Sequence, residues 1–266
     1  MRLLLIHTGG TLMSSRGHGG GAPLAPDAYT RDLLAELPVL RKIAEIETTI
    51  LFNLDSSNIQ PHHWVELAHA VHAALACGRY DGVVVVHGTD TMAYTASALP
   101  FMLHGLGKPV IITGSQIPLC EIRNDARENL ITSLMIAADY AIPEVCLYFG
   151  GKLLRGCRAV KVSASGFAAF DSPNFPPLGN VGIDIDIEWE LVRPRPRGAG
   201  RRSQKLKVQE LGAPVVSALR LFPGISPELV RNVLRPPLQG LVLEAYGVGN
   251  GPDQNTAFLD ALAEAT

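Results

Sequence analysis

Two short polar motifs each follow an apolar run that has the composition of a β-strand, and this pairing constrains the fold strongly. Residues 3–6 lead into His-Thr-Gly-Gly-Thr at 7–11, and four valines at 83–86 lead into His-Gly-Thr-Asp-Thr-Met at 87–92. Open parallel sheets bind ligands at the carboxyl ends of their strands. We therefore predict that both motifs lie at one sheet edge, where hydroxyls, a carboxylate and glycine turns indicate a nucleophilic hydrolase site.

The composition is typical of a chain that buries a large core. Of its 266 residues, 47% are hydrophobic and only 18% are charged. The net charge of −2 gives no field that favours nucleic acid or membrane partners. No apolar run approaches the roughly 18 residues needed to span a bilayer. Because the first residues are already strand-like and the four cysteines (77, 120, 146 and 157) are scattered, we expect a cytoplasmic protein with reduced thiols.

Short apolar runs alternate with amphipathic stretches over the first two thirds of the chain. Strands are expected at 2–7, 46–52, 82–87, 108–113, 145–149 and 158–163, with a half-exposed strand near 183–190. Helices are expected at 27–37, 61–77, 91–104 and 124–139. This alternation predicts an α/β fold, in which helices flank both faces of a mainly parallel sheet.

A basic stretch then interrupts the pattern. Residues 193–207 contain seven cations together with prolines and glycines, a composition typical of a solvated linker. A nucleic-acid patch is the lesser alternative, because no aromatic side chain interleaves the charges. We predict an N-terminal α/β catalytic domain at 1–190, a linker at 191–212 and a smaller C-terminal α/β domain at 213–266.

The C-terminal domain has a simple pattern. Strands at 214–221 and 239–245 alternate with helices at 226–235 and from about 253. A single unit of this kind cannot easily bury its own faces. We therefore expect this domain to be incomplete or to pack on another surface.

The polar residues expected at the sheet edge suggest specific chemistry. A threonine hydroxyl becomes a good nucleophile only when a base removes its proton. Lys161 could be that base if its segment is buried, with Asp90 holding it by an ion pair and Thr89 relaying a proton. Thr11 is the other candidate nucleophile, at a glycine turn whose amides could stabilise an oxyanion. Ser56 and Asp90 could bind the carboxylate and amino groups of an α-amino acid.

Ordinary structural roles compete with each of these assignments. Asp90 could cap a following helix. Considered alone, Lys161 is better explained as a lysine that keeps an edge strand soluble. His7 and His87 precede the glycine turns and are assigned no catalytic role. The histidines at 62, 63, 69 and 72 lack companions at ligand spacing, so no metal is expected. The glycines at 247, 249 and 251 do not match a dinucleotide motif, so no cofactor is expected.

Taken in order, the motifs resemble those of the bacterial L-asparaginases, specifically the cytoplasmic type I branch. They are Thr-Gly-Gly-Thr (8–11), Leu-Asp-Ser-Ser (54–57), His-Gly-Thr-Asp-Thr-Met-Ala-Tyr-Thr (87–95), Gly-Lys-Pro-Val-Ile-Ile-Thr-Gly-Ser-Gln-Ile-Pro (107–118), Ser-Pro-Asn-Phe-Pro-Pro-Leu (172–178), Pro-Gly-Ile-Ser (223–226) and Tyr-Gly-Val-Gly-Asn (246–250). The resemblance runs from residue 3 to residue 266. It implies cofactor-free hydrolysis of L-asparagine to L-aspartate and ammonia through a covalent threonyl ester.

The resemblance also implies a role for individual residues. Thr11 matches the family's first nucleophilic threonine, and Thr89, Asp90 and Lys161 match its Thr-Asp-Lys set. Ser56 and Asp90 match substrate binders, and the adjacent Asp55 and Ser57 complete the expected substrate-binding set. Asn250 matches a residue that a neighbouring subunit lends to the site, so a homodimer or homotetramer is expected.

The chain departs from the family pattern in places. The loop at 14–23 places Gly21 where the family has a tyrosine, and Tyr29 is the nearest tyrosine. Ala159 and Val160 replace hydroxyl residues and Glu244 replaces a basic residue, so cooperativity is not assumed. Two alternatives remain: an inactive asparagine- or aspartate-binding relative, and the ammonia-generating amidase module of a transfer-RNA-dependent amidotransferase. The second is disfavoured because the chain begins directly with its first strand.

Overall fold

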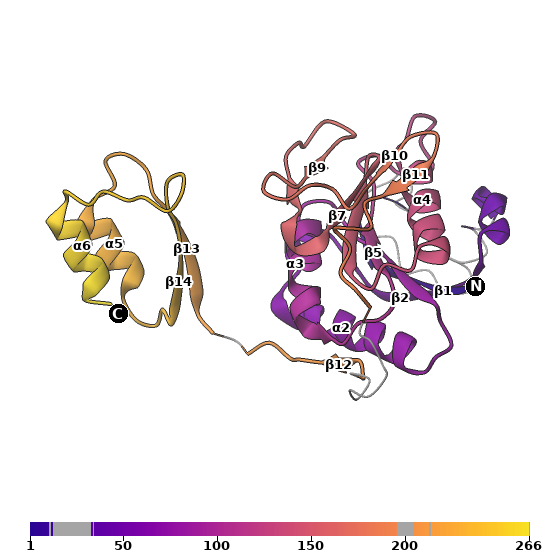
Figure 1. Ribbon diagram of the computed structural model, residues 1–266, viewed down its shortest axis with the longest axis horizontal. Helices are drawn as coiled ribbons and strands as arrows, with labels where there is room; N and C mark the ends of the chain where they lie inside the picture. Colours follow the sequence, from indigo (N-terminus) through magenta and orange to yellow (C-terminus); the bar gives the residue numbers. More distant parts are fainter. Residues whose placement is uncertain (11, 13–32, 34, 196–204, 213, 266) are drawn as a thin grey trace. The chain divides into compact units, whose positions relative to one another are not determined.

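The computed structural model describes residues 1–10, 12, 33, 35–195, 205–212 and 214–265. These residues form two compact units, Met1–Leu211 and Gly212–Thr266, and each unit is described by itself (Figure 1). Within the described ranges, no helix combines the length and the apolar character needed to cross a membrane.

An eight-stranded mixed sheet forms the centre of the first unit (Figure 1). Its strands are β1 (Arg2–Gly9), β2 (Glu45–Leu54), β3 (Gly82–Val86), β5 (Val110–Thr113), β6 (Val145–Phe149), β7 (Lys152–Arg155), β10 (Gly179–Val181) and β11 (Ile185–Ile187). The strand order is β11-β10-β7-β6-β5-β3-β1-β2. The five strands β2, β1, β3, β5 and β6 are parallel, and the remaining three are antiparallel. The predicted α/β class is therefore confirmed.

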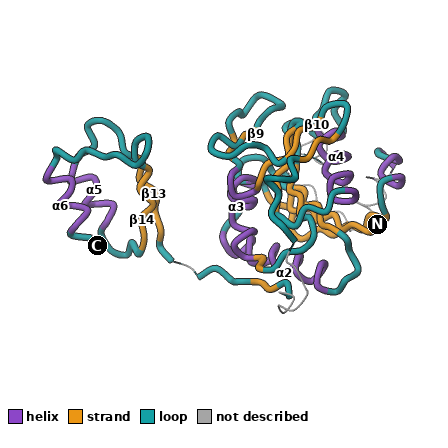
Figure 2. Tube along the Cα trace, in the orientation of Figure 1, coloured by secondary structure: helices purple, strands orange, loops and turns teal. Residues whose placement is uncertain are grey.

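Helices cover both faces of this sheet, as Figures 1 and 2 show. The helices are α2 (Pro61–Ala76), α3 (Met92–Met102) and α4 (Ala126–Asp139). Successive strand side chains point to opposite faces. Leu4 therefore packs with α2 and α3, whereas Leu5 packs with α4, and each face has its own apolar core. Burial on both faces explains why the central strands read as continuous apolar runs.

The helices predicted at 61–77, 91–104 and 124–139 are present, but their ends differ from the prediction. Helix α2 begins where Gln60 and His63 form a reciprocal capping box, with Pro61 at the first helical position. Three short 3₁₀ helices span Pro38–Lys42, Ser56–Asn58 and Gly156–Arg158. The predicted helix at 27–37 lies mostly outside the described residues.

The predicted strand at 158–163 is wrong for most of its length. The strand there is limited to β8 (Val160–Lys161), which pairs with β9 (Phe170–Asp171) in a separate two-stranded sheet. A Cβ at Gly156 would lie 2.4 Å from the Ala96 carbonyl oxygen of α3. The chain thus passes tightly against α3 and turns through a 3₁₀ helix, instead of continuing as a strand.

The basic stretch is only partly as predicted, and residues 196–204 lie outside the description. Strand β12 (Lys207–Val208) pairs with β4 (Leu103–His104). Val208 packs against the apolar core on the sheet face that α2 and α3 cover. The Nε2 atom of His72 in α2 lies 3.0 Å from the carbonyl oxygen of Leu206. Residues 205–208 are therefore attached to the first unit, because two apolar side chains alternate with the cations.

The second unit contains β13 (Val216–Arg220), α5 (Pro227–Leu234), β14 (Gly240–Glu244) and α6 (Thr256–Ala263). The two strands are parallel, and the predicted strand-helix-strand-helix order is present. The side chains of Ser226 and Asn255 cap the two helices, each accepting a backbone N–H at 3.1 Å. A small core around Val230 and Phe258 joins the helices to the strands.

Candidate active site

The order of the parallel strands gathers four loops at one edge of the sheet. Strands β2, β1, β3 and β5 are consecutive neighbours, so the segments that follow them emerge together. These segments contain residues 55–58 after β2, Gly10 after β1, residues 88–90 after β3 and residues 114–116 after β5. The structure therefore brings the two glycine motifs to the same edge, as the sequence predicts.

Glycines allow these loops to touch through their backbones. Gly10 has a φ of +88°, and a Cβ there would lie 2.6 Å from the Cα of Gly88. A Cβ at Gly88 would in turn lie 2.7 Å from both the Cβ and the Oγ of Ser56. Gly88 is therefore the point where the ends of β1, β2 and β3 meet, and a side chain there would force them apart.

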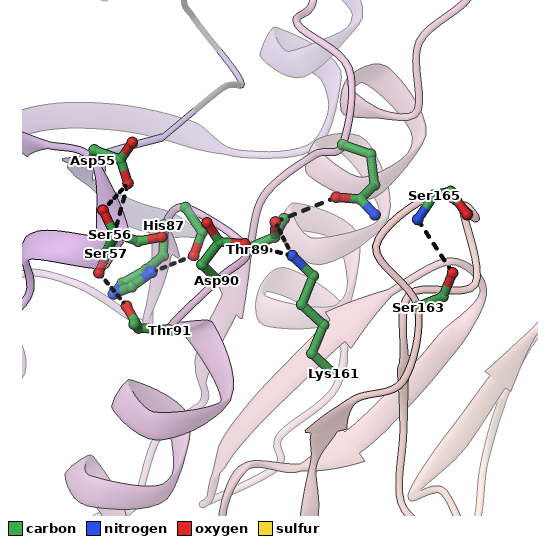
Figure 3. Close-up of polar contacts among 12 residues, drawn as sticks. Asp55, Ser56, Ser57, His87, Thr89, Asp90, Thr91, Lys161, Ser163 and Ser165 are labelled. Carbon is green, nitrogen blue, oxygen red and sulfur yellow. Dashed lines mark hydrogen bonds and ion pairs between the residues drawn. The ribbon is translucent and has the colours of Figure 1, made fainter.

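Lys161 lies at the centre of the polar contacts shown in Figure 3. Its Nζ donates to the Oγ1 of Thr89 at 2.9 Å and to the Oδ1 of Asp90 at 2.7 Å. The Thr89 residue is 8% exposed, and the Lys161 and Asp90 side chains are 21% and 64% exposed. The predicted ion pair is present, although the lysine reaches it from the short strand β8.

Asp90 does not have the helix-capping role considered above. Helix α3 begins after Thr91, which occupies the N-cap position without a side-chain capping bond. The Thr91 hydroxyl donates instead to the Ser56 carbonyl at 2.7 Å. The carboxylate of Asp90 thus accepts from Lys161, and the same amine contacts the Thr89 hydroxyl.

Gln116 is a member of this cluster to which the sequence assigned no role. The Thr89 hydroxyl donates to its Oε1 at 3.3 Å, and its Nε2 donates to the Gly166 carbonyl at 3.3 Å. The backbone N–H of Gln116 donates to the buried carboxylate of Asp125 at 2.9 Å. Its position directly after β5, within the motif at 107–118, is the sequence signal that locates it at the same sheet edge as Thr89.

Three of the predicted substrate-binding residues, Asp55, Ser56 and Ser57, lie together on the loop after β2. Asp55 accepts hydrogen bonds from the N–H and hydroxyl of Ser57, at 2.9 and 2.8 Å (Figure 3). These bonds lower the pKa of the Asp55 carboxyl. Ser56 is buried against Gly88, whereas Asp55 and Ser57 are exposed.

Two histidines precede the glycine turns and are buried. Burial lowers the pKa of both His7 and His87 to about 4. The Nδ1 of His87 lies 2.8 Å from the Gly88 carbonyl oxygen, and its Nε2 lies 2.8 Å from the Oγ1 of Thr95. The hydroxyl of Thr8 donates to the Val86 carbonyl at 2.8 Å, which ties β1 to the end of β3.

Other predicted site residues lie elsewhere. Thr11, the loop at 14–23 and Tyr29 are outside the described residues. Asn250 belongs to the second unit, where its backbone closes a turn with Tyr246 at 2.9 and 3.0 Å. Across the described parts of the chain, no three histidine, cysteine or acidic side chains are grouped as metal ligands would be.

Comparisons with known proteins extend over the whole chain. Residues 2–193 match the family described as "Asparaginase, N-terminal", and residues 215–266 match the "Glutaminase/Asparaginase C-terminal domain". L-asparaginase 1 of Escherichia coli is 44% identical over 99% of this chain and 76% of its own length. A component of the glutamyl-tRNA(Gln) amidotransferase of Pyrococcus abyssi is 34% identical, over 98% of this chain and 59% of its own length. The crystal structure of L-asparaginase I from Vibrio cholerae superposes with a TM-score of 0.84 at 40% identity, covering 99% of this chain and 77% of that one.

Proposed function

The chain belongs to the asparaginase family, and from that premise we propose that it hydrolyses L-asparagine to L-aspartate and ammonia. One observation carries the proposal: the Lys161 amine contacts both the Thr89 hydroxyl and the Asp90 carboxylate at the edge where four strand ends meet. A hydroxyl, an amine and a carboxylate in direct contact can move a proton, and amide hydrolysis requires proton transfer at each step.

The reaction proceeds in two halves through a covalent intermediate. In the first half, the Thr11 hydroxyl attacks the side-chain amide carbon of asparagine, a C–O bond forms and the C–N bond breaks. The threonine proton leaves with the departing nitrogen as ammonia. In the second half, water attacks the threonyl ester, aspartate departs and Thr11 regains its proton. The resemblance to the family supports Thr11 as the nucleophile.

Thr89, Lys161 and Asp90 form the proton path of this proposal. Lys161 in its neutral form accepts the proton of Thr89, whose oxygen takes a proton from the attacking water. Lys161 then carries a positive charge that the Asp90 carboxylate, 2.7 Å away, stabilises.

We assign substrate binding to the loop after β2 together with Asp90 from the loop after β3. Ser56 and Asp90 bind the α-carboxylate and the α-amino group of asparagine, and Asp55 and Ser57 complete this pocket. The two hydrogen bonds from Ser57 to Asp55 support a fixed loop conformation before substrate arrives.

A binding-only relative is the second candidate, and the contact between Lys161 and Thr89 counts against it. A binding protein has no need for an amine that touches a hydroxyl. The amidotransferase alternative is less favoured, because identity to the amidotransferase component of Pyrococcus abyssi is 34%, against 44% for the asparaginase of Escherichia coli.

We also propose a homo-oligomer and a cytoplasmic location. The resemblance assigns Asn250 to the site of a neighbouring subunit, which a homodimer or homotetramer provides. All four cysteines lie within the described residues and none forms a disulfide, which agrees with a reducing compartment.

Product analysis tests the proposed function directly. Proton NMR of purified protein with L-asparagine should show L-aspartate appearing as asparagine disappears, with one ammonia released per aspartate. A parallel sample with L-glutamine measures the preference between the two amides. Asparagine that binds but remains unchanged would contradict the proposal and favour the binding-only relative.

A further inference from the structure

His87 is the central member of a buried chain of hydrogen bonds whose direction is fixed by chemistry. The Gly88 carbonyl oxygen can only accept, so the Nδ1 of His87, 2.8 Å away, must carry the hydrogen. Trp64 can only donate, and its Nε1 lies 3.0 Å from the Oγ1 of Thr95. The Thr95 hydrogen is then directed to the Nε2 of His87, at 2.8 Å. The series of hydrogen bonds therefore runs from Trp64 through Thr95 and His87 to the Gly88 carbonyl.

This series of hydrogen bonds requires a neutral imidazole, and the surroundings of His87 favour its neutral form. The residue is 2% exposed, and Thr95 is fully buried. Burial penalises the charged form of histidine and lowers the pKa of His87 to about 4. Near neutral pH the ring is therefore uncharged, with one nitrogen donating and the other accepting, as the chain demands.

The acceptor of this chain belongs to the peptide that carries Thr89. The Gly88 carbonyl and the Thr89 N–H are parts of one planar unit, so holding the carbonyl fixes the direction in which Thr89 leaves β3. The Thr89 hydroxyl then meets the Lys161 Nζ at 2.9 Å. Figure 3 shows the side chains of His87, Thr89 and Lys161 and the contact between Thr89 and Lys161.

We propose that His87 is a positioning residue for amide hydrolysis, in which its Nδ1–H holds the Gly88 carbonyl and thereby directs the Thr89 hydroxyl to Lys161. This proposal rests on the function proposed above. It differs from a core-filling role, because it depends on one donor at one position of the ring and not on the volume of the side chain.

Two substitutions separate these roles. In His87→Asn, the side-chain amide nitrogen occupies about the place of Nδ1 and can still donate to Gly88. In His87→Gln, the longer amide reaches the place of Nε2, so it keeps the contact with Thr95 but not the one with Gly88. Glutamine resembles histidine more closely in volume, so a core-filling role predicts that it is the milder change.

Steady-state ammonia release from L-asparagine measures the outcome, with thermal unfolding of each variant as the check on folding. We expect His87→Gln to lower kcat by about 100-fold with KM changed by less than about threefold, since small displacements of catalytic groups have effects of this size. His87→Asn should restore kcat to within about threefold of wild type. A folded His87→Gln protein with wild-type kcat, or a folded His87→Asn protein as impaired as His87→Gln, would overturn the proposal.

A second measurement needs neither activity nor a stable variant. Long-range ¹H–¹⁵N NMR of the histidine rings in the wild-type protein distinguishes an Nδ1–H from an Nε2–H tautomer. The proposal requires Nδ1–H for His87 at neutral pH, and an Nε2–H tautomer would overturn it. Absence of asparagine turnover in the wild-type protein would instead contradict the proposed function, while the tautomer still decides the assignment of His87.

Discussion

The Nζ of Lys161 lies 2.9 Å from the Oγ1 of Thr89, although 72 residues separate them in the chain. Thr89 leaves the carboxyl end of a central parallel strand, whereas Lys161 comes from a strand of two residues beside the main sheet. The hydroxyl of a residue that is only 8% exposed thus contacts an amine, and Asp90 contacts the same amine. The proposed proton transfer depends on this contact.

Loss of the Thr89 hydroxyl should abolish the proton path while the side chain still fills its space in the site. Thr89→Val keeps the shape of the side chain and removes the oxygen that contacts Lys161. We expect kcat for ammonia release to fall by about 10³-fold or more. Thr89→Ser keeps a hydroxyl and serves as the matched control, with kcat within about tenfold of wild type. Wild-type turnover by the valine variant would remove Thr89 from the mechanism.

Gly88 should tolerate no side chain. In Gly88→Ala the new Cβ would lie 2.7 Å from the Ser56 side chain, and the loops that meet there would have to separate. We expect a loss of about 1–3 kcal/mol in the free energy of unfolding together with lower activity. Gly107→Ala is the control, because a Cβ there has no neighbour within 4 Å. Urea denaturation of both variants measures the difference, and equal stabilities would refute the contact.

Acid should destabilise the protein through its buried histidines. Burial lowers the pKa of His7 and His87 to about 4, whereas histidine in an unfolded chain titrates near 6.5. Between these values the unfolded chain binds more protons, so the free energy of unfolding falls as the pH drops from 6.5 to 4. Each histidine accounts for a loss on the order of 3 kcal/mol. Urea denaturation from pH 7 to pH 4 should give a shallower fall in His87→Asn, and parallel curves would contradict this prediction.

Complementation between inactive chains tests the proposed contribution of Asn250 to a neighbouring subunit. Asn250→Ala and Lys161→Met should each be inactive alone. In a mixed dimer, one site combines an intact Lys161 with an intact Asn250 from the other chain, so random mixing restores about a quarter of the sites. Ammonia release by the co-refolded mixture measures this. A mixture as inactive as its components would indicate that each chain uses its own Asn250.

The meeting of the glycine motifs could be predicted, because it follows from strand order in a parallel sheet. Apolar runs and polar ends along the sequence are enough to locate the loops after β1 and β3 at one edge. The ion pair between Lys161 and Asp90 could also be predicted, because a lysine that acts as a base needs a carboxylate to hold it in place. These predictions depend on local pattern and on the general rule that open parallel sheets present polar loops at the carboxyl ends of their strands.

Tertiary contacts explain the features that could not be predicted. The chain turns at Gly156 because its backbone packs on α3, and nothing in the residues around it signals that contact. Strand β7 was not expected, since it pairs with β6 through a tight turn at Gly150 and Gly151 and is only four residues long.

The initial rate of ammonia release from L-asparagine by wild-type protein and by Lys161→Met tests the central claim most directly. Lys152→Met is the matched control, because Lys152 pairs with Asp171 outside the proposed site. We expect Lys161→Met to lose at least about 10³-fold in kcat while calorimetry still detects asparagine binding, and Lys152→Met to retain wild-type activity. Turnover by Lys161→Met close to that of wild type would contradict the assigned proton path, and with it the account of how this site works.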